Sequence, residues 1–346
     1  MNPVLTAIIA ILVFSFLILI HELGHFITAR IFKVTVNEFS IGMGPRLLSR
    51  TSKKTGIKYS LAAFPIGGFV AMAGEADESD DPNSFDKKPA WQRFIITAAG
   101  ATVNIVAGFI AILIITALID IGGTTVHSFK ETPYEISSED SGLMANDTII
   151  KVDGKRVSFA EELSYEIMRR GYEPVDLTVI RNGEEMVISN VVFPTSGEAG
   201  QTFGVMDFYI TGAKKNIGTT LGYAVSKSVL IIRMCWESII DLITGRYSLA
   251  AVSGPVGIST AIGDAAKAGT LQLLNLAALI SINLGVMNLL PIPALDGGRL
   301  LTTGVEMVTR KKLPAKIENT INAVGLILLL GLSIVIMFKD IFQLIF

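Results

Sequence analysis

Residues 94–119 read FIITAAGATVNIVAGFIAILIITALI and contain no charged side chain. A helix needs about 20 apolar residues to cross the hydrocarbon layer of a bilayer, so this stretch predicts a membrane span. Three further stretches approach or exceed that length without a charge, namely 3–20, 268–295 and 319–338. In the first of them the apolar pattern continues past Glu22 through Leu23, Phe26, Ile27 and Ala29. The expected fold class is therefore a polytopic α-helical membrane protein with four transmembrane helices.

The composition of the whole chain supports this class. Hydrophobic residues make up 50% of the 346 residues and charged residues only 17%, whereas a soluble domain carries about 25% charged residues. These values exclude a disordered chain, a fibrous repeat and an ordinary cytosolic enzyme. The net charge of −2 gives no reason to expect a nucleic-acid partner. The single cysteine, Cys235, excludes an intramolecular disulfide framework and a cysteine-cluster metal site.

Lysine and arginine are concentrated in two of the three connections between the expected spans. Ten of them lie between the first and second spans, and the connection between the third and fourth contains Arg299, Arg310, Lys311, Lys312 and Lys316. Basic loops stay on the cytoplasmic side of a membrane, so both connections are expected there. Both chain termini and the long connection between the second and third spans then lie outside the cytoplasm.

The outer connection divides into two parts. Residues 124–195 predict a small α+β domain, with a strand at 148–154, a helix at 159–170 and two strands at 175–180 and 186–193 joined by the turn residues RNG. Residues 212–246 predict an amphipathic helix with Arg233, Glu237 and Asp241 on one face. Such a helix suits the membrane interface or a groove between the spans. A helix packed on the soluble domain is the alternative.

The sequence His21-Glu-Leu-Gly-His25 carries the first chemical signal. Residues four apart stack on one face of a helix, so both imidazoles can bind one metal ion. Glu22 lies beside them, where it can take a proton from a metal-bound water. Ionisable residues in a membrane span are costly and functional by default. The alternative is that these side chains are only hydrated at the cytoplasmic interface.

A catalytic zinc site needs three protein ligands and an open position. The remaining histidine, His127, is expected to be an ordinary surface residue. Asp296, in NLLPIPALDGG at 288–298, is the candidate, because the first and third spans run in the same direction and both sites lie near an inner end. Pro291 and Pro293 should break the helix there, and freed backbone groups persist at membrane depth only within protein or beside water. A merely kinked helix with a hydrated Asp296 is the alternative.

The pairing of HELGH with NLLPIPALDGG resembles the site-2 proteases, which are zinc metalloproteases that cut substrates within the membrane. The chain looks most similar to the bacterial RseP/RasP group, which has four spans and an extracytoplasmic PDZ insertion between the second and third. Three further stretches resemble family segments: FSIGMGPR at 39–46, FPIGGFVAMAGE at 64–75 and SGPVGI at 253–258.

The resemblance implies roles for particular residues. His21, His25 and Asp296 would bind Zn²⁺, and Glu22 would be the general base. Asn283 and Asn288 match family asparagines that contact substrate in the third span, where an amide can hold an extended backbone or polarise the scissile carbonyl. Alternatively, Asn288 only satisfies carbonyl groups freed by the two prolines.

Residues 59–72 alternate loosely between apolar and polar side chains and are interrupted by Pro65, Gly67 and Gly68. They resemble the family's membrane-associated β-hairpin, expected at about 58–73. An exposed strand edge there would hold an unwound substrate segment by β-augmentation, which makes Gly67 and Gly68 candidate substrate-binding residues. A surface hairpin that only caps the cytoplasmic face is the alternative.

Residues 141–154, SGLMANDTIIKVDG, resemble the AGLxxGDxIxxVxG segment of bacterial PDZ domains. Asn146 replaces the usual glycine and Ser141 replaces alanine. Asparagine tolerates a positive φ, so the expectation of a PDZ fold stands. In this protease group the PDZ domain is thought to act as a size filter against bulky outer domains. Only one such domain fits between the spans.

The expected organisation has seven parts. The helix with HELGH occupies 1–30, the cytoplasmic connection with its β-hairpin 31–92, and the second transmembrane helix 93–120. The extracytoplasmic PDZ domain follows at 121–200 and an amphipathic helical region at 201–267. The third transmembrane segment occupies 268–308 and the fourth helix 317–346.

The expected function is that of a zinc-dependent intramembrane endopeptidase, which performs regulated intramembrane proteolysis on single-span proteins such as anti-sigma factors or remnant signal peptides. Its partners would be these substrates, the lipid bilayer and an upstream site-1-type protease, in the bacterial cytoplasmic membrane. The alternative is a metal transporter or a non-catalytic membrane scaffold. A transporter should show inverted repeats or a path of intramembrane ionisable residues, and the sequence has neither.

Overall fold

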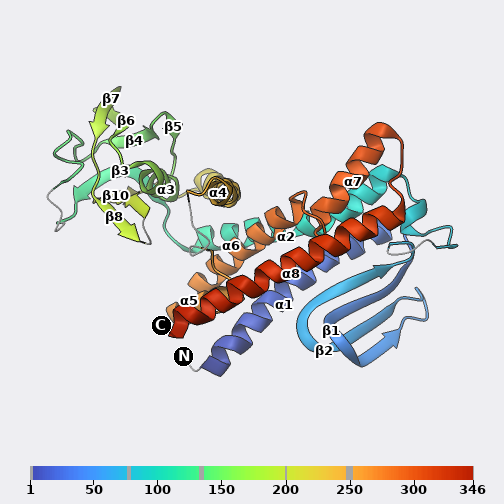
Figure 1. The fold of residues 1–346 in the computed structure, drawn as a ribbon. Coiled ribbons are helices and arrows are strands. Elements are labelled where there is room, and N and C mark those ends of the chain that lie inside the picture. Colours follow the sequence, from blue (N-terminus) through green and yellow to red (C-terminus); the bar gives the residue numbers. More distant parts are fainter. Residues whose placement is uncertain (1–2, 76–78, 132–135, 199–200, 247–251, 346) are drawn as a thin grey trace. The chain divides into compact units, whose positions relative to one another are not determined.

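The computed structural model describes residues 3–75, 79–131, 136–198, 201–246 and 252–345. The chain divides into two compact units. The first is formed by Met1–Ala111 together with Val252–Phe346, and the second by Ile112–Ala251. Figure 1 labels most of the elements of both units.

Four helices among the described residues are long and apolar enough to cross a membrane. They are α1 (Pro3–Ile31), α2 (Ala90–Leu118), α6 (Thr270–Leu289) and α8 (Ala315–Ile345). Many of their leucine, isoleucine and valine side chains are exposed, as is required where a helix faces lipid tails. The prediction of four spans is confirmed, and the chain is a multi-pass membrane protein.

Small residues let these helices approach one another closely. A Cβ atom at Gly24 of α1 would lie 2.6 Å from the carbonyl oxygen of Ala99 on α2. A Cβ atom at Gly108 of α2 would lie 2.9 Å from the carbonyl oxygen of Ala278 on α6. Helices in membranes commonly pack through small residues, because lipid tails supply no hydrophobic driving force between them. Since Gly24 precedes His25, the α1–α2 contact lies at the level of the HELGH motif.

The third span is broken at the two prolines, as the sequence predicts. α6 ends at Leu289, and a separate helix, α7 (Asp296–Thr309), follows. Another short helix, α5 (Pro255–Ala268), precedes α6. Asp340 of α8 caps it by accepting hydrogen bonds of 2.9 Å from the backbone N–H groups of Gly254 and Gly257. Thus α5, although it falls within the expected outer region 201–267, belongs to the first unit.

A two-stranded sheet, β1 (Val36–Thr51) and β2 (Lys58–Met72), follows α1. The prediction of a hairpin within 58–73 is wrong in its extent, because these residues form one strand whose partner is the preceding β1. Pro65, Gly67 and Gly68 suggest a turn, but the strand continues through them because β1 supplies backbone partners beyond that point.

The register of this sheet creates an outer edge. Residues 38–41 of β1 align with 68–71 of β2 and also with 58–61, so the two ends of β2 lie on opposite sides of that part of β1. Residues 68–72 therefore lie at the margin of the sheet. Buried apolar side chains hold the sheet to the ends of α1 and α2, namely Ala29, Val34, Val36, Ile57, Val70, Met72, Phe85 and Ile96, of which Phe85 lies in a 3₁₀ turn, η1 (Phe85–Lys87).

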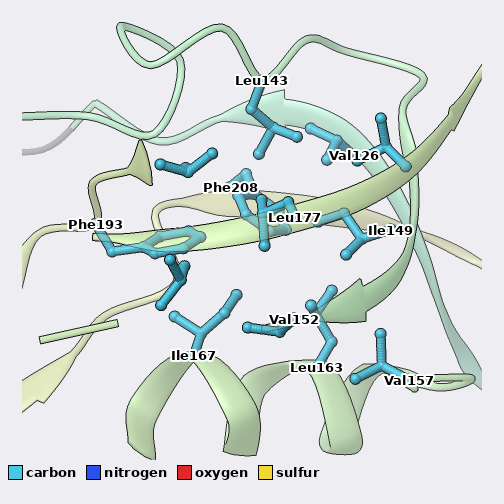
Figure 2. Close-up of a cluster of buried hydrophobic side chains, with 13 residues drawn as sticks. Val126, Leu143, Ile149, Val152, Val157, Leu163, Ile167, Leu177, Phe193 and Phe208 are labelled. Atoms are coloured by element: carbon cyan, nitrogen blue, oxygen red, sulfur yellow. The ribbon is translucent and has the colours of Figure 1, made fainter. Parts of the chain in front are cut away.

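The second unit contains a sheet of strand order β10-β3-β4-β6-β7, with β5 paired to β4. Its elements are β3 (Gly122–Phe129), β4 (Thr148–Val152), β5 (Lys155–Arg156), α3 (Ala160–Arg170), β6 (Val175–Arg181), β7 (Glu184–Val191) and β10 (Phe208–Gly212). A separate two-stranded antiparallel sheet comprises β8 (Thr195–Glu198) and β9 (Gln201–Gly204). Figure 2 shows Leu163 and Ile167 of α3 pointing toward Ile149 and Leu177 of the sheet.

The predicted strands and helix of this unit are confirmed by β4, α3, β6 and β7. The expectation for Asn146 is also confirmed, because its backbone φ is 72°. Asn182 and Gly183, in the predicted turn between β6 and β7, have φ values of 54° and 89°. Positive values at both positions are typical of the tight turns that join antiparallel strands.

The amphipathic helix of the sequence is α4 (Ile217–Ile243). Its polar face packs on α3. Asp241 accepts hydrogen bonds from Arg169 at 2.5 and 3.1 Å, Glu237 accepts one from the Tyr165 hydroxyl at 2.5 Å, and Arg233 pairs with Glu166. For the polar face of α4, the alternative in which the helix packs on the soluble domain is therefore correct.

Candidate metal centre and active site

Two histidines and one aspartate converge in the first unit. Nε2 of His21 lies 3.2 Å from Nε2 of His25. Oδ2 of Asp296 lies 3.1 Å from the first nitrogen and 3.3 Å from the second. His21 and His25 are one turn apart on α1, and Asp296 is the first residue of α7. The structure thus brings together side chains from the first and the third spans, with His21 and Asp296 separated by 275 positions in the sequence.

The ring of His25 is held by α2. Its Nδ1–H group donates a hydrogen bond of 2.8 Å to the carbonyl oxygen of Ile96. Because a carbonyl can only accept, the ring proton is on Nδ1 and Nε2 keeps its lone pair. The lone pair faces the His21–Asp296 cluster, where a metal ion can use it. Backbone support of this kind is the usual way in which a metal-binding histidine is oriented.

Asp296 is brought into place by a tight turn between α6 and α7. A Cβ atom at Gly297 would lie 1.8 Å from the carbonyl oxygen of Leu290, and one at Gly298 would lie 2.7 Å from that of Ile292. No larger residue fits these contacts without moving the backbone. The two glycines of the LDGG sequence therefore allow the first turn of α7 to fold back on the broken end of α6.

The donor set fits a zinc ion. Tetrahedral zinc with bonds of about 2.0–2.1 Å holds its ligand atoms about 3.3 Å apart, close to the separations found here. Oδ2 of Asp296 is buried and receives no hydrogen bond within the part of the chain that the structure describes. A buried carboxylate oxygen without a donor is costly unless a cation compensates it. Two imidazoles and one carboxylate are also a common ligand set for catalytic zinc.

Glu22 lines the same cavity of about 200 Å³ as the two histidines and Asp296. The remaining lining residues are Phe69, Val70, Met72, Glu75, Thr97 and Arg299. Arg299 of α7 donates a hydrogen bond of 2.5 Å to Glu75, which follows β2. This ion pair borders both this cavity and a second polar cavity of about 230 Å³.

Of the two strand glycines expected at the site, Gly68 lies beside it. A Cβ atom at Gly68 would lie 3.6 Å from Cγ of Glu22 and 2.8 Å from the carbonyl oxygen of Ser40. Gly67 has a φ of 88° and packs against Met43. Gly68 therefore lets the edge of β2 approach Glu22 closely, whereas Gly67 provides a bend in the strand.

Asn283 and Asn288 lie on α6 and are partly buried. Neither is among the described residues that line the cavity around Glu22. The structure thus brings His21, Glu22, His25, Asp296 and Gly68 together, and leaves these two asparagines on the helix that leads to Asp296.

Comparison with known proteins agrees with this geometry. Residues 9–332 match the family described as Peptidase family M50. The chain belongs to this family of site-2 proteases. The M50 protein is 37% identical over 334 residues to a candidate zinc metalloprotease of Clostridium acetobutylicum, with 96% of both chains covered. It is 35% identical over 335 residues to one of Clostridium perfringens, covering 96% of this chain and 98% of the relative. A similar protein of Fusobacterium nucleatum is 34% identical over 354 residues.

The M50 protein is therefore a membrane-embedded metalloprotease, and its cofactor is zinc.

One residue beside the metal-binding cluster, Gly100, was not predicted from the sequence. A Cβ atom at Gly100 of α2 would lie 2.3 Å from Nε2 of His25 and 2.8 Å from Nε2 of His21. Glycine is needed here because the two rings occupy the space of a side chain. The small residues at 98–101 were the available signal, but small residues are common in membrane helices for packing alone.

Proposed function

We propose that this M50 protein is an intramembrane endopeptidase in which His21, His25 and Asp296 bind zinc and Glu22 is the general base. The observation that carries the proposal is the convergence of three ligand atoms within 4.8 Å of one another. Glu22 borders the same cavity, beside the ligands and not among them. That division of roles, three ligands and one free carboxylate, is what hydrolysis by a metalloprotease requires.

The reaction needs a proton to move twice. When bound, zinc polarises the scissile carbonyl and makes water more acidic. The Glu22 carboxylate accepts a proton from the attacking water and then donates it to the nitrogen of the leaving amine. His25, fixed by the Ile96 carbonyl, keeps its position during both transfers. The adjoining apolar side chains, including Phe69 and Val70, limit the access of competing water.

A substrate helix must be unwound before its peptide bonds can react, because its backbone groups are paired within the helix. We propose that residues 68–72 receive the unwound segment as an added strand. They are paired with β1 on one side, and Gly68 adjoins Glu22. Strand addition would then place a peptide bond near the metal-binding cluster. Gly67 and Gly68 would serve by keeping this edge free of side chains.

Asn283 and Asn288 are assigned a secondary role in this proposal. They lie on the helix that ends shortly before Asp296, and their amides would contact the extended substrate backbone. The other interpretation, in which Asn288 satisfies carbonyls at the broken helix end, predicts that Asn288→Ala lowers stability and leaves substrate affinity unchanged.

The α+β domain of the second unit, expected at 121–200, is proposed to be a PDZ domain outside the cytoplasm that filters substrates by size. Its support is the SGLMANDTIIKVDG segment, the strand and helix order, and the positive φ of Asn146. The concentration of lysine and arginine in the two other connections supports an orientation with both termini on the outer side of a bacterial cytoplasmic membrane. A substrate such as an anti-sigma factor or remnant signal peptide would enter after a site-1-type protease has removed its outer domain.

The apolar face of α4 is proposed to rest on the bilayer surface. Exposed side chains recur along one side of the helix, namely Ile217, Leu221, Val225, Val229, Trp236, Ile240 and Ile243. Nζ of Lys215 donates hydrogen bonds of 3.0 and 2.7 Å to the carbonyl oxygens of Ala117 and Ile119, at the end of the spanning helix α2. The start of α4 is thus tied to the point where a span leaves the membrane.

The proposal is tested with Glu22→Gln, which keeps the size of the side chain but removes the base. The purified full-length protein and the variant are placed in liposomes with a single-span substrate, and zinc is measured in both. Cleavage by the wild type alone, with about one zinc in each protein, is the expected result. Cleavage by the variant at the wild-type rate would exclude Glu22 as the base. If neither protein holds zinc, the His21–His25–Asp296 centre is wrong.

A further inference from the structure

Asn104 is a fully buried amide within the membrane-spanning helix α2, with an exposed fraction of 0%. Its Nδ2 atom lies 3.4 Å from Nδ1 of His21. Its Oδ1 atom has no hydrogen-bond partner among the described residues. A buried carbonyl oxygen without a donor is costly, particularly in a membrane, so this atom calls for an explanation.

The position of Asn104 follows from the spacing of α2. Ile96, Gly100 and Asn104 are four residues apart, so they lie on one face of the helix. The carbonyl of Ile96 holds His25, and Gly100 makes room for both rings. Asn104 is the next residue on that face and reaches the far nitrogen of His21. One face of α2 therefore supports both histidines.

The orientation of the amide decides which nitrogen of His21 can bind a metal. With Nδ2 toward the ring, Nδ1 must accept, and the single proton of a neutral imidazole is on Nε2. That tautomer cannot use Nε2 as a ligand. With the amide rotated by 180°, Oδ1 accepts the proton of Nδ1 and Nε2 has a free lone pair. The same rotation gives the unpaired Oδ1 a donor.

We propose that Asn104 is a positioning residue of the metal centre, whose side-chain oxygen accepts the Nδ1–H of His21 and so fixes the tautomer that binds zinc. This inference rests on the proposed role of His21 as a ligand. It makes the two histidines equivalent, each with its Nδ1–H bonded to an oxygen from α2. Outer partners of this kind typically change metal affinity by about 10–100-fold.

The test compares Asn104→Leu with Asn104→Asp. Leucine has nearly the same size but no acceptor, whereas aspartate keeps an oxygen at the same place. Ser281→Ala is the matched control, because Oγ of Ser281 donates to the backbone oxygen of Asn104 at 2.8 Å and belongs to the same buried contact. Zinc affinity is measured by competition with a chelator on full-length protein in detergent, and thermal unfolding is measured on the metal-free proteins.

We expect Asn104→Leu to bind zinc about 10–100-fold more weakly. Asn104→Asp and Ser281→Ala should stay within about threefold of the wild type, and all metal-free proteins should unfold at similar temperatures. Wild-type affinity in Asn104→Leu would overturn the proposal. Equal losses in all three variants would also overturn it, since they would show a packing effect. If His21→Ala keeps wild-type zinc affinity, the assignment of His21 as a ligand fails. That result differs from the two results that would overturn the role of Asn104 alone.

Discussion

At the scale of single residues, the metal-binding cluster depends on the missing side chain at Gly100 of α2 as much as on the two histidines of α1. His21 and His25 need the space over Gly100, and His25 needs the carbonyl of Ile96. The HELGH sequence shows the donors but not this support, because main-chain oxygens leave no pattern in a sequence and small residues are common in membrane helices for packing alone. Asp296 was predictable, since the direction of the spans placed it at the depth of the histidines.

Gly100→Ala tests the space requirement. The added methyl group would lie 2.3 Å from Nε2 of His25, so the ring must move away from its partners. We expect zinc affinity and proteolysis to fall at least about tenfold, with the protein still folded. Gly331→Ala is the control, because a Cβ atom there meets nothing within 4 Å. The zinc content of both purified variants is the measurement that tests this prediction. A Gly100→Ala protein with full zinc content would contradict the close packing described here.

At the scale of elements, the long helices could be predicted and the sheet could be predicted only in part. Apolar runs of membrane length identify a span without reference to any neighbour. A strand needs a partner, and its register depends on residues elsewhere in the chain. The sequence therefore predicts a separate hairpin at about 58–73, whereas the structure pairs residues 58–72 with β1. The two faces of α4 were ambiguous for the same reason, because its partner α3 is about 70 residues away.

The β1–β2 sheet should be sensitive to acid through Glu38. Arg46 donates two hydrogen bonds of 2.6 Å to its carboxylate, and these bonds, with help from Ser60 and Lys58, lower the pKa of Glu38 to about 2. An unfolded glutamate has a pKa of about 4.3, so the ionised group stabilises the sheet above that pH. This contribution is lost as the pH falls toward 2.

Glu38→Gln should accordingly weaken hydrogen-exchange protection of the sheet at pH 7. The difference from the wild type should shrink between about pH 4.5 and pH 2, because the wild-type carboxylate becomes protonated there. Glu185→Gln, which removes an exposed pair with Lys151, serves as the control and should change little. A difference that is the same at pH 7 and pH 3 would rule out the charged pair as its source.

The apolar face of α4 gives a spectroscopic prediction. The chain has two tryptophans, Trp91 and Trp236, so Trp91→Phe leaves Trp236 as a single probe. In liposomes, brominated lipids should quench its fluorescence, most strongly with bromine near the headgroup end of the chain, since interfacial helices lie at the acyl boundary. The reciprocal variant, Trp236→Phe, reports Trp91 alone. Absence of quenching for Trp236, together with quenching by a water-soluble agent, would show that α4 faces water.

At the scale of the whole molecule, the α+β domain of the second unit is an insertion whose ends meet. Gly122, at the start of β3, is the cross-strand partner of Gly212, at the end of β10. The backbone N–H of Ala213 also donates to the carbonyl of Ile121 at 2.7 Å. The chain thus leaves α2, builds the α+β domain and returns to the same place before α4. The proposed filtering function can therefore be tested apart from catalysis, because the candidate metal ligands all belong to the other unit.

Removal of residues 123–211, with a short glycine linker between Gly122 and Gly212, tests this separation. The loss of α3 exposes Arg233, Glu237 and Asp241 of α4 to water, which charged groups tolerate, so the remaining chain should still fold and bind zinc. The shortened protein should cut a truncated single-span substrate at a rate similar to the full chain. It should also cut the same span carrying a folded outer domain, which the full chain should reject. Glu22→Gln in the shortened protein is the control for contaminating proteases. If the shortened protein cleaves the truncated substrate but leaves the bulky one intact, the domain is not a size filter.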